Sequence, residues 1–283
     1  MKKNRLNIFG SAVLAAFLIF ACGNAEVPLP QKEALYQKGV NFAAEGRWKE
    51  AREEFKKVLE ASKTDSTSLS SLKVLRDFEE GSLSQEFTLL FFKGIAFLVG
   101  NQPREAIVEL QKALLIKEDY AKVYNILGMA YASSGDTAQA IAHFKKALKI
   151  NPSYTEALFN LASYQSSLGN YQQALECYQI VIALEPDSGD AYADIAGVYA
   201  ALDQYPQSIS YYRKLIALNS LNGHAYYNLG LAYFMIDDFT RARESLASAK
   251  EIFQQKNDLE NVEVAGAYLE KLKQFEDTWG ASR

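Results

Sequence analysis

Apolar and small residues recur at helical spacing along most of this chain, with polar residues between them. In the clearest stretch, Tyr124, Leu127 and Tyr131 form one set, and Ala140 and Phe144 begin a second. Because residues three or four positions apart lie on one face of a helix, each set forms a single apolar stripe. The pattern therefore predicts two amphipathic helices that pack against each other across a short polar turn.

The same pattern returns with a period of 34 residues, which indicates an array of helical hairpins. Four copies follow one another in phase over 121–256, and a backward step finds a fifth copy from Phe87. A sixth copy begins at Lys32, but 21 additional residues, Ser66 to Glu86, separate it from the fifth. Where the two helices of each hairpin should cross, the copies carry Gly39, Gly94, Gly128, Ala162, Ala196 and Gly230. Such small residues let two helix axes approach to about 8 Å.

The copy from Ala121 resembles the tetratricopeptide repeat (TPR) nearly in full. It contains Tyr124-x2-Leu127-Gly128-x2-Tyr131, then Ala140-x3-Phe144-x2-Ala147, then Pro152. The resemblance extends over about 32–256, with few departures: Gln165 occupies an aromatic position and Ser208 a small apolar one. It implies an all-α TPR helical-hairpin solenoid, a right-handed superhelix of about six repeats with a concave groove along the first helices and a C-terminal capping helix.

These patterns predict the organisation of the whole chain. We expect a lipoprotein signal peptide at 1–21, a lipidated N-terminus and tether at 22–31, repeat 1 at 32–65, an insertion at 66–86, repeats 2 to 6 at 87–256, and a capping helix with a tail at 257–283. The capping helix is indicated by apolar residues at helical spacing between Leu259 and Phe275. At the start of the insertion, Thr64–Ser68 is polar and predicted to be a loop, followed by a short helix around Leu69–Leu75.

Residues 87–99 are apolar on nearly every face, with Lys93 as the only charge. A helix of this composition is normally buried all round. Two interpretations stay open at this point. Either the helix of the insertion covers the segment, or the segment is an exposed surface for a partner, for a second copy of the chain in a homo-oligomer, or for an acyl chain.

The N-terminus carries an export signal. Lys2, Lys3 and Arg5 precede the uncharged run from Ile8 to Cys22, and this run is too short to favour a permanent transmembrane helix. Its end, Ile19-Phe20-Ala21-Cys22, resembles a lipobox, the motif whose cysteine receives diacylglycerol before cleavage.

The resemblance to a lipobox implies a lipid anchor on Cys22 in the bacterial cell envelope. Gly23 after the cysteine favours the outer membrane of a two-membrane organism. The alternative is an ordinary secretory signal that is cleaved after Ala25, which would give a periplasmic or secreted protein.

Charge and cysteine content exclude several classes of function. Removal of residues 1–21 leaves 27 basic and 34 acidic residues, a net charge of −7, with lysines and arginines interspersed among glutamates. Nucleic-acid binding requires a concentrated basic surface and is therefore disfavoured. Besides Cys22 the chain has only Cys177, so we expect no disulfide framework and no thiolate metal site.

The TPR resemblance places the first helix of each repeat along the groove. Asn160, Asp194 and Asn228 are 34 residues apart and occupy equivalent positions there. Such a row resembles the asparagine ladder with which some TPR proteins hold a peptide backbone, although solvated groove residues are an equally good interpretation. We predict a peptide- or partner-binding groove formed by Asn125, Phe159, Asn160, Asp194, Tyr227, Asn228 and Phe234.

No pattern indicates an enzyme, a metal site or a cofactor. The two histidines, His143 and His224, are 81 residues apart and have no ligand-type residues at metal-binding spacing. The sequence therefore predicts a non-catalytic, lipid-anchored TPR scaffold or adaptor that binds protein or peptide partners. The alternatives are a carrier of an apolar small molecule that works beside a transporter, and a self-associating structural subunit.

Overall fold

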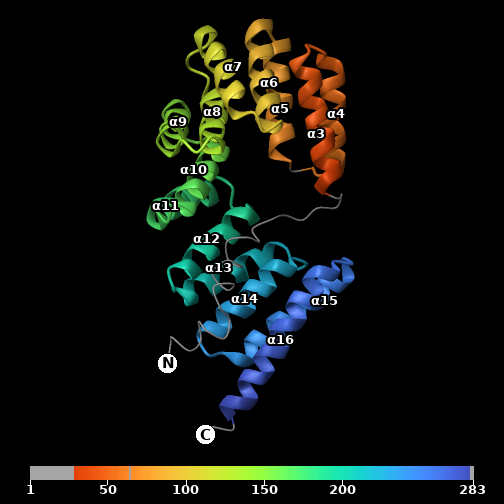
Figure 1. Cartoon of the computed structure of the whole chain (residues 1–283), viewed down its shortest axis with the longest axis vertical. Helices are drawn as coiled ribbons and strands as arrows, with labels where there is room; N and C mark the ends of the chain where they lie inside the picture. The colour runs from red at the N-terminus through yellow and green to blue at the C-terminus, as the bar shows by residue number, and fades with distance from the viewer. Residues whose placement is uncertain (1–28, 64, 281–283) are drawn as a thin grey trace. The chain divides into compact units, whose positions relative to one another are not determined.

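The computed structural model describes residues 29–63 and 65–280. The predicted signal peptide, the lipidation site at Cys22 and the tether up to residue 28 lie outside the described residues. Over the part that is described, the chain forms fourteen α-helices and no β-strand, which confirms the all-α prediction. Figure 1 shows these helices with their labels.

The chain divides into two compact units. The described helices of the N-terminal unit are α3 (Leu29–Ala44), α4 (Trp48–Ala61), α5 (Ser66–Glu79), α6 (Gln85–Val99), α7 (Pro103–Ile116), α8 (Ala121–Ser133), α9 (Thr137–Ile150) and α10 (Thr155–Ser167). Those of the C-terminal unit are α11 (Tyr171–Leu184), α12 (Gly189–Ala201), α13 (Tyr205–Leu218), α14 (Gly223–Met235), α15 (Phe239–Gln255) and α16 (Leu259–Gly280).

The helical hairpins pack as the small-residue positions predict. A Cβ atom added to Gly128 of α8 would lie 2.6 Å from the ring of Phe144 on α9. A Cβ atom on Gly230 of α14 would lie 2.8 Å from Leu246 on α15. Real carbon atoms do not approach so closely, so a larger residue would push the two helices apart. The two units therefore contain the same kind of hairpin.

The turn inside each hairpin contains one residue in the left-handed region of backbone conformation. Between residues 101 and 237 this residue recurs every 34 positions, at Asn101, Gly135, Gly169, Asp203 and Asp237, with φ between 57° and 83°. Glycine, asparagine and aspartate are the residues that tolerate this conformation best. The turn residues thus repeat with the same period as the apolar stripes.

Two boundaries differ from the sequence prediction. Ser66–Ser68 was expected to be a loop but is helical, because the Asp65 side chain accepts a hydrogen bond from the Ser68 N–H group at 2.8 Å and caps helix α5. Leu29–Gln31, expected in the tether, already belong to α3. Pro30 does not prevent this, because proline in the first turn of a helix removes no internal hydrogen bond.

Helix α6, the segment that is apolar on nearly every face, is largely buried. It packs against α3 and α7 and also contacts α5. Phe87, Phe91 and Ile95 are between 1% and 6% exposed, and the ring of Tyr120 lies edge-on against Phe87 at 5.1 Å. Burial within the N-terminal unit thus leaves little of this segment exposed apart from its end, where Val99 is 44% exposed, and self-association through 87–99 stays a prediction. The covering helices are mainly α3 and α7, with a smaller share from the insertion helix α5.

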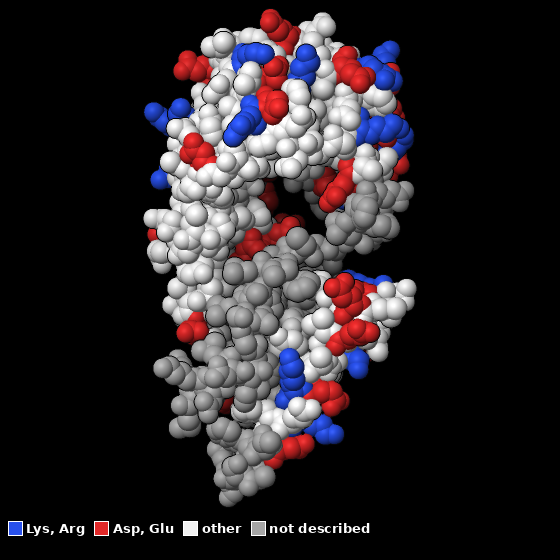
Figure 2. Space-filling model, viewed as in Figure 1, with Lys and Arg blue, Asp and Glu red and all other residues white. Residues whose placement is uncertain are grey.

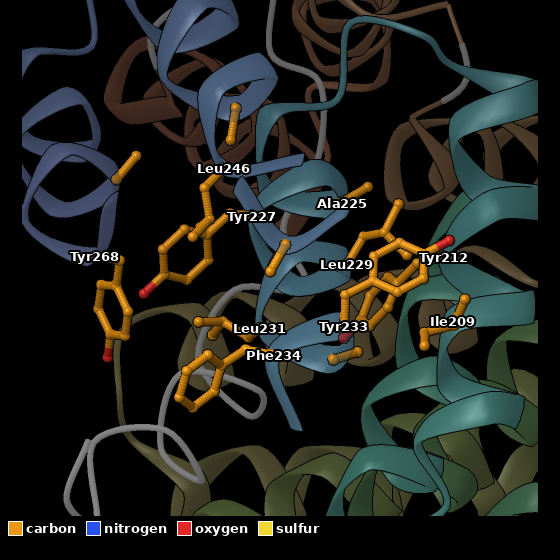
Figure 3. Packing of buried hydrophobic residues seen from close by; sticks show 14 of the residues in the cluster. Ile209, Tyr212, Ala225, Tyr227, Leu229, Leu231, Tyr233, Phe234, Leu246 and Tyr268 are labelled. Carbon is orange, nitrogen blue, oxygen red and sulfur yellow. The ribbon is translucent and has the colours of Figure 1, made fainter. Parts of the chain in front are cut away.

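The C-terminal unit ends in the predicted capping helix. Ala265 and Leu272 of α16 are buried, and the helix packs against α15 and α14. Figure 3 shows the cluster that results, in which aromatic side chains of α14 lie beside Tyr268 of α16. Among the described residues, no helix is both long enough and apolar enough to cross a membrane.

Candidate partner-binding surfaces

Two of the predicted groove residues meet in the N-terminal unit. Asn160 on α10 donates a hydrogen bond from Nδ2 to Oδ1 of Asn125 on α8, over 3.0 Å. Asn125 is buried, whereas Asn160 and its neighbour Phe159 are half-buried. The structure therefore links the first helices of two successive repeats through a pair of amides, with one member accessible from solvent.

Helix α5 contacts α3 and the N-terminal end of α8. The hydroxyls of Tyr36 on α3 and Ser71 on α5 are 3.3 Å apart. Tyr120, which precedes α8, donates a hydrogen bond to Oδ2 of Asp77 over 3.4 Å. These contacts show that the insertion helix covers side chains of the first helices. The repeat pattern of the sequence gave no signal for this placement, because α5 has no counterpart in the other repeats.

Lys122 on α8 lies at the centre of this contact. Its Nζ atom donates a hydrogen bond to Oγ of Ser70 on α5 and lies 5.8 Å from the ring centroid of Tyr154. Burial disfavours the charged form and lowers the pKa of Lys122, and burial raises the pKa of Tyr120 and of Tyr154. The surface that α5 covers is thus polar but poorly hydrated. The negative charges of Glu156 and Asp77 act in the opposite direction on the pKa of Lys122.

In the C-terminal unit, Asp194 and Tyr178 form a hydrogen bond. The Tyr178 hydroxyl on α11 donates to Oδ2 of Asp194 on α12 over 2.8 Å. Asp194 is half-buried. The charge of Asp194 and, above all, burial raise the pKa of the neighbouring Tyr212. Since Asn160 lies in one unit and Asp194 in the other, the polar row predicted from the repeats stays a prediction.

Helix α16 covers two further predicted groove residues. Tyr227 and Phe234 are 4% and 5% exposed. Their rings pack edge-on against Tyr268 and Phe275 of α16, at centroid distances of 5.4 and 5.5 Å. The prediction placed these two aromatic residues at an open groove, whereas the structure makes them core residues of the C-terminal unit (Figure 3). The physical reason is that a capping helix buries the apolar face that the last repeat would otherwise expose.

Asn228, next to Tyr227 on α14, is also buried, at 4% exposure. Its Oδ1 atom has no hydrogen-bond partner among the described residues. A buried amide oxygen without a partner costs free energy, so this position is not optimised for stability. A contact between Asn228 and a partner stays a prediction.

The histidines take part in packing. His143 stacks on Tyr131 at 4.8 Å and its Nδ1 atom lies 2.8 Å from the Gln139 carbonyl oxygen. His224 lies edge-on against Phe253 at 4.9 Å. Over residues 29–63 and 65–280, no group of three or more His, Cys, Asp or Glu side chains is arranged to hold a metal ion.

The surface charge is mixed in the view that Figure 2 gives of the N-terminal unit. Lys and Arg side chains alternate with Asp and Glu over this face. Several of them form ion pairs within one helix, such as Lys112 with Glu109 and Lys56 with Glu53. This distribution matches the interspersed charges of the sequence.

Four segments of the chain match models of one known protein family. Models of the tetratricopeptide repeat match residues 33–62, 121–154, 155–188 and 194–257. Among curated proteins, none matches this chain.

Several solved structures share the fold. A crystal structure of MamA is 25% identical over 58% of this chain and 96% of its own, with a TM-score of 0.55. MamA from Desulfovibrio magneticus RS-1 (residues 41 to the end) is 22% identical over 61% of this chain and 97% of its own, with a TM-score of 0.57. YrrB, described as a TPR protein with an unusual peptide-binding site, is 19% identical over 68% of this chain and 96% of its own, with a TM-score of 0.53. At such identities the likeness concerns the fold.

Proposed function

Because the chain belongs to the tetratricopeptide repeat family, we propose that it is an exported, lipid-anchored scaffold that holds protein or peptide partners at the bacterial cell envelope. Protein–protein interaction is the function that the repeats support. The export and the anchor rest on the basic lead and on the lipobox-like end at Cys22. The proposal includes no catalytic step.

The amide pair of Asn125 and Asn160 is the observation that carries the scaffold proposal. The hydrogen bond between them uses one N–H group of Asn160 and leaves its carbonyl oxygen to accept from another donor. Because Asn160 is only half-buried, a peptide backbone could reach its amide, and Phe159 on the same helix is also half-buried. This is the chemistry that a peptide-binding groove needs.

The scaffold proposal is tested by crosslinking in the native host, followed by identification of the captured proteins. We expect Asn160→Ala to reduce the yield of at least one specific partner by about fivefold, since one hydrogen bond between neutral groups contributes about 1 kcal/mol. The matched control is Gln173→Ala, which removes an exposed amide from α11, a second helix. If both variants capture the wild-type set of proteins, the groove assignment is wrong.

The lipid anchor is tested separately by fractionation. Cys22→Ser should move the protein from the membrane fraction to the soluble fraction, because only a cysteine at this position can receive diacylglycerol. Cys177→Ser changes the second cysteine of the chain and should leave the protein on the membrane. In a two-membrane organism we expect the wild type in the outer membrane. Equal distribution of the Cys22 variant and the wild type would refute the anchor while leaving the scaffold proposal intact.

A further inference from the structure

One lysine recurs at the same position of several second helices, but what lies beside it differs between repeats. In α7, Lys112 forms a salt bridge with Glu109, three residues earlier, at 2.6 Å. Steps of 34 residues from this pair lead to His143 and Lys146 on α9 and, after one more repeat, to Tyr211 and Lys214 on α13. Helices α9 and α13 thus keep the lysine and replace the glutamate with an aromatic residue.

Neither helix supplies another carboxylate. Of the six second helices that the structure describes, α9 and α13 are the two without an aspartate or a glutamate. Lys146 and Lys214 are exposed, and within the described residues neither forms a salt bridge. The net charge of the whole chain is −4, so two helices with positive charge alone differ from the rest of it.

On α13 the lysine lies over a set of tyrosine rings. Tyr211 stacks on Tyr199 of α12 at a centroid distance of 5.5 Å, and Tyr192 of α12 lies 6.1 Å from Tyr211. The Nζ atom of Lys214 lies 4.6 Å from the centroid of Tyr211 and 6.0 Å from that of Tyr192. The three tyrosines are half-buried, so their rings support the lysine and remain accessible in part.

The N-terminal unit contains the same arrangement 68 residues earlier in the sequence. His143 stacks on Tyr131, and Nζ of Lys146 lies 5.6 Å from the ring centroid of Tyr124. Here the rings are less open, since Tyr124 and His143 are 9% and 8% exposed. A carboxylate also acts nearby, because the charge of Glu118 adds to burial in raising the pKa of Tyr124. Of the two surfaces, the one on α13 is therefore the more accessible.

The comparison between repeats indicates what these lysines lack. In α7 a glutamate of the same helix compensates the ammonium group, whereas on α13 that position is occupied by a ring. A carboxylate from outside would restore the ion pair, and the flat faces of the tyrosines would give apolar contact to the residues around it. A nucleic acid is a poor match, because α13 offers only the adjacent Arg213 and Lys214 and not a basic stripe.

From this charge complementarity we propose that the tyrosine and lysine surface of α12 and α13 binds an acidic segment of a partner protein, and that the equivalent surface of α8 and α9 binds a second such segment. A carboxylate of the partner takes the place that Glu109 has beside Lys112. This inference rests on the proposed scaffold function and specifies a partner surface separate from Asn125 and Asn160.

The test is a titration of the purified full chain, in detergent, with a fluorescent polyglutamate peptide followed by anisotropy. The double variant Lys146→Gln, Lys214→Gln should bind the peptide about fivefold more weakly than the wild type. The matched control is Lys56→Gln, Lys112→Gln, which removes the same charge from lysines that are paired with Glu53 and Glu109. It should stay within about twofold of the wild type. Equal weakening in both double variants, or no binding to the wild type, would overturn the proposal.

A second variant tests the role of the missing carboxylate. Tyr211→Glu would place a glutamate three residues before Lys214, as in α7, and this internal pair should compete with the peptide. Measured in the Lys146→Gln background, it should weaken binding at least as much as Lys214→Gln does. Gln207→Glu adds the same charge to an exposed position of α13 about 10 Å further along the helix, too far to pair with Lys214, and should leave the affinity unchanged. Wild-type affinity of the Tyr211→Glu protein would contradict the proposal.

Vesicles that contain phosphatidylglycerol distinguish a protein partner from an anionic membrane. The two double-lysine variants should sediment equally with such vesicles. If the Lys146 and Lys214 variant alone lost vesicle binding while it still bound polyglutamate, the surface would face a membrane and the proposal would be wrong.

Crosslinking in the native host separates this inference from the scaffold proposal. Loss of a captured protein from the Lys146 and Lys214 variant, but not from the control variant, supports both. If both variants capture the wild-type set, this surface is not the site, although the chain is still a scaffold. If the wild type captures no protein, the scaffold proposal fails, and the inference about a partner fails with it even where the peptide binds.

Discussion

The N-terminal and C-terminal units share one kind of hairpin but cover their first helices differently. In the N-terminal unit, α5 reaches Tyr36 and Lys122 through hydrogen bonds of serine hydroxyls. In the C-terminal unit, α16 covers Tyr227 and Phe234 through aromatic rings. Both units therefore place one of their own helices over residues that the repeats alone would leave open.

The difference between these covers is one of chemistry. A buried aromatic side chain removes about 150 Å² or more from water, which corresponds to about 4 kcal/mol. A hydrogen bond between neutral groups contributes about 1 kcal/mol. The cover formed by α16 therefore depends mainly on aromatic rings, whereas α5 combines hydrogen bonds with the burial of Val74 and Leu75, which are 0% exposed. The following predictions test this contrast, from the largest effect to the smallest.

Phe275→Ala should have the largest effect. Phe275 is 9% exposed and packs at 5.5 Å against both Phe234 and Phe239, so we expect a loss of about 3–5 kcal/mol in the free energy of unfolding of the C-terminal unit. Chemical denaturation followed by circular dichroism measures it. Leu259→Ala on the same helix is the control, since Leu259 is 66% exposed and should change stability by less than about 0.5 kcal/mol. A similar loss in both variants would mean that α16 is not held by these rings.

Gly128→Ala and Gly230→Ala should have intermediate and similar effects. The added methyl group would meet Phe144 or Leu246 at less than 3 Å, and overpacking of this kind costs about 1–3 kcal/mol. Gly266→Ala is the control, because its Cβ would lie 3.6 Å from the flexible end of Lys250. Thermal denaturation of the three variants would show whether the hairpins of the two units are equivalent. A clear difference between the first two would weaken the view that only the covers differ.

The contribution of the Asp65 carboxylate to stability should be smaller, and it should depend on pH. Burial by itself would raise the pKa of Asp65, but hydrogen bonds from Lys32, Thr67 and Ser68 outweigh it and lower that pKa in the folded protein. A carboxylate whose pKa is lowered by folding stabilises the protein above its unfolded pKa of about 4, and this stabilisation is lost as the pH falls further.

Two substitutions at Asp65 separate the charge from the cap. Asp65→Asn should abolish this acid-dependent part while keeping the cap of α5, and Asp65→Ala should cost about 1 kcal/mol at neutral pH as well. Hydrogen exchange of α5 between pH 3 and pH 7 checks both, with helix α8 as the internal reference. An unchanged acid dependence in Asp65→Asn would show that other carboxylates are responsible.

The sequence by itself determined the hairpins. Glycines at 128 and 230 and the apolar partners Phe144 and Leu246 recur with the 34-residue period, and local spacing alone brings each pair together across one turn. The sequence also assigned Asn125 and Asn160 to the groove-facing side of their helices, so it could predict that they lie near each other, as their hydrogen bond shows.

The tertiary structure alone decided which of these residues remain accessible. Helix α5 has no counterpart in the repeat, so no period predicts its contact with Lys122. Helix α16 was expected as a cap, but its packing against Tyr227 and Phe234 depends on how three helices meet in space. Periodicity specifies contacts between neighbours in the sequence, whereas burial also depends on segments that the repeat does not contain.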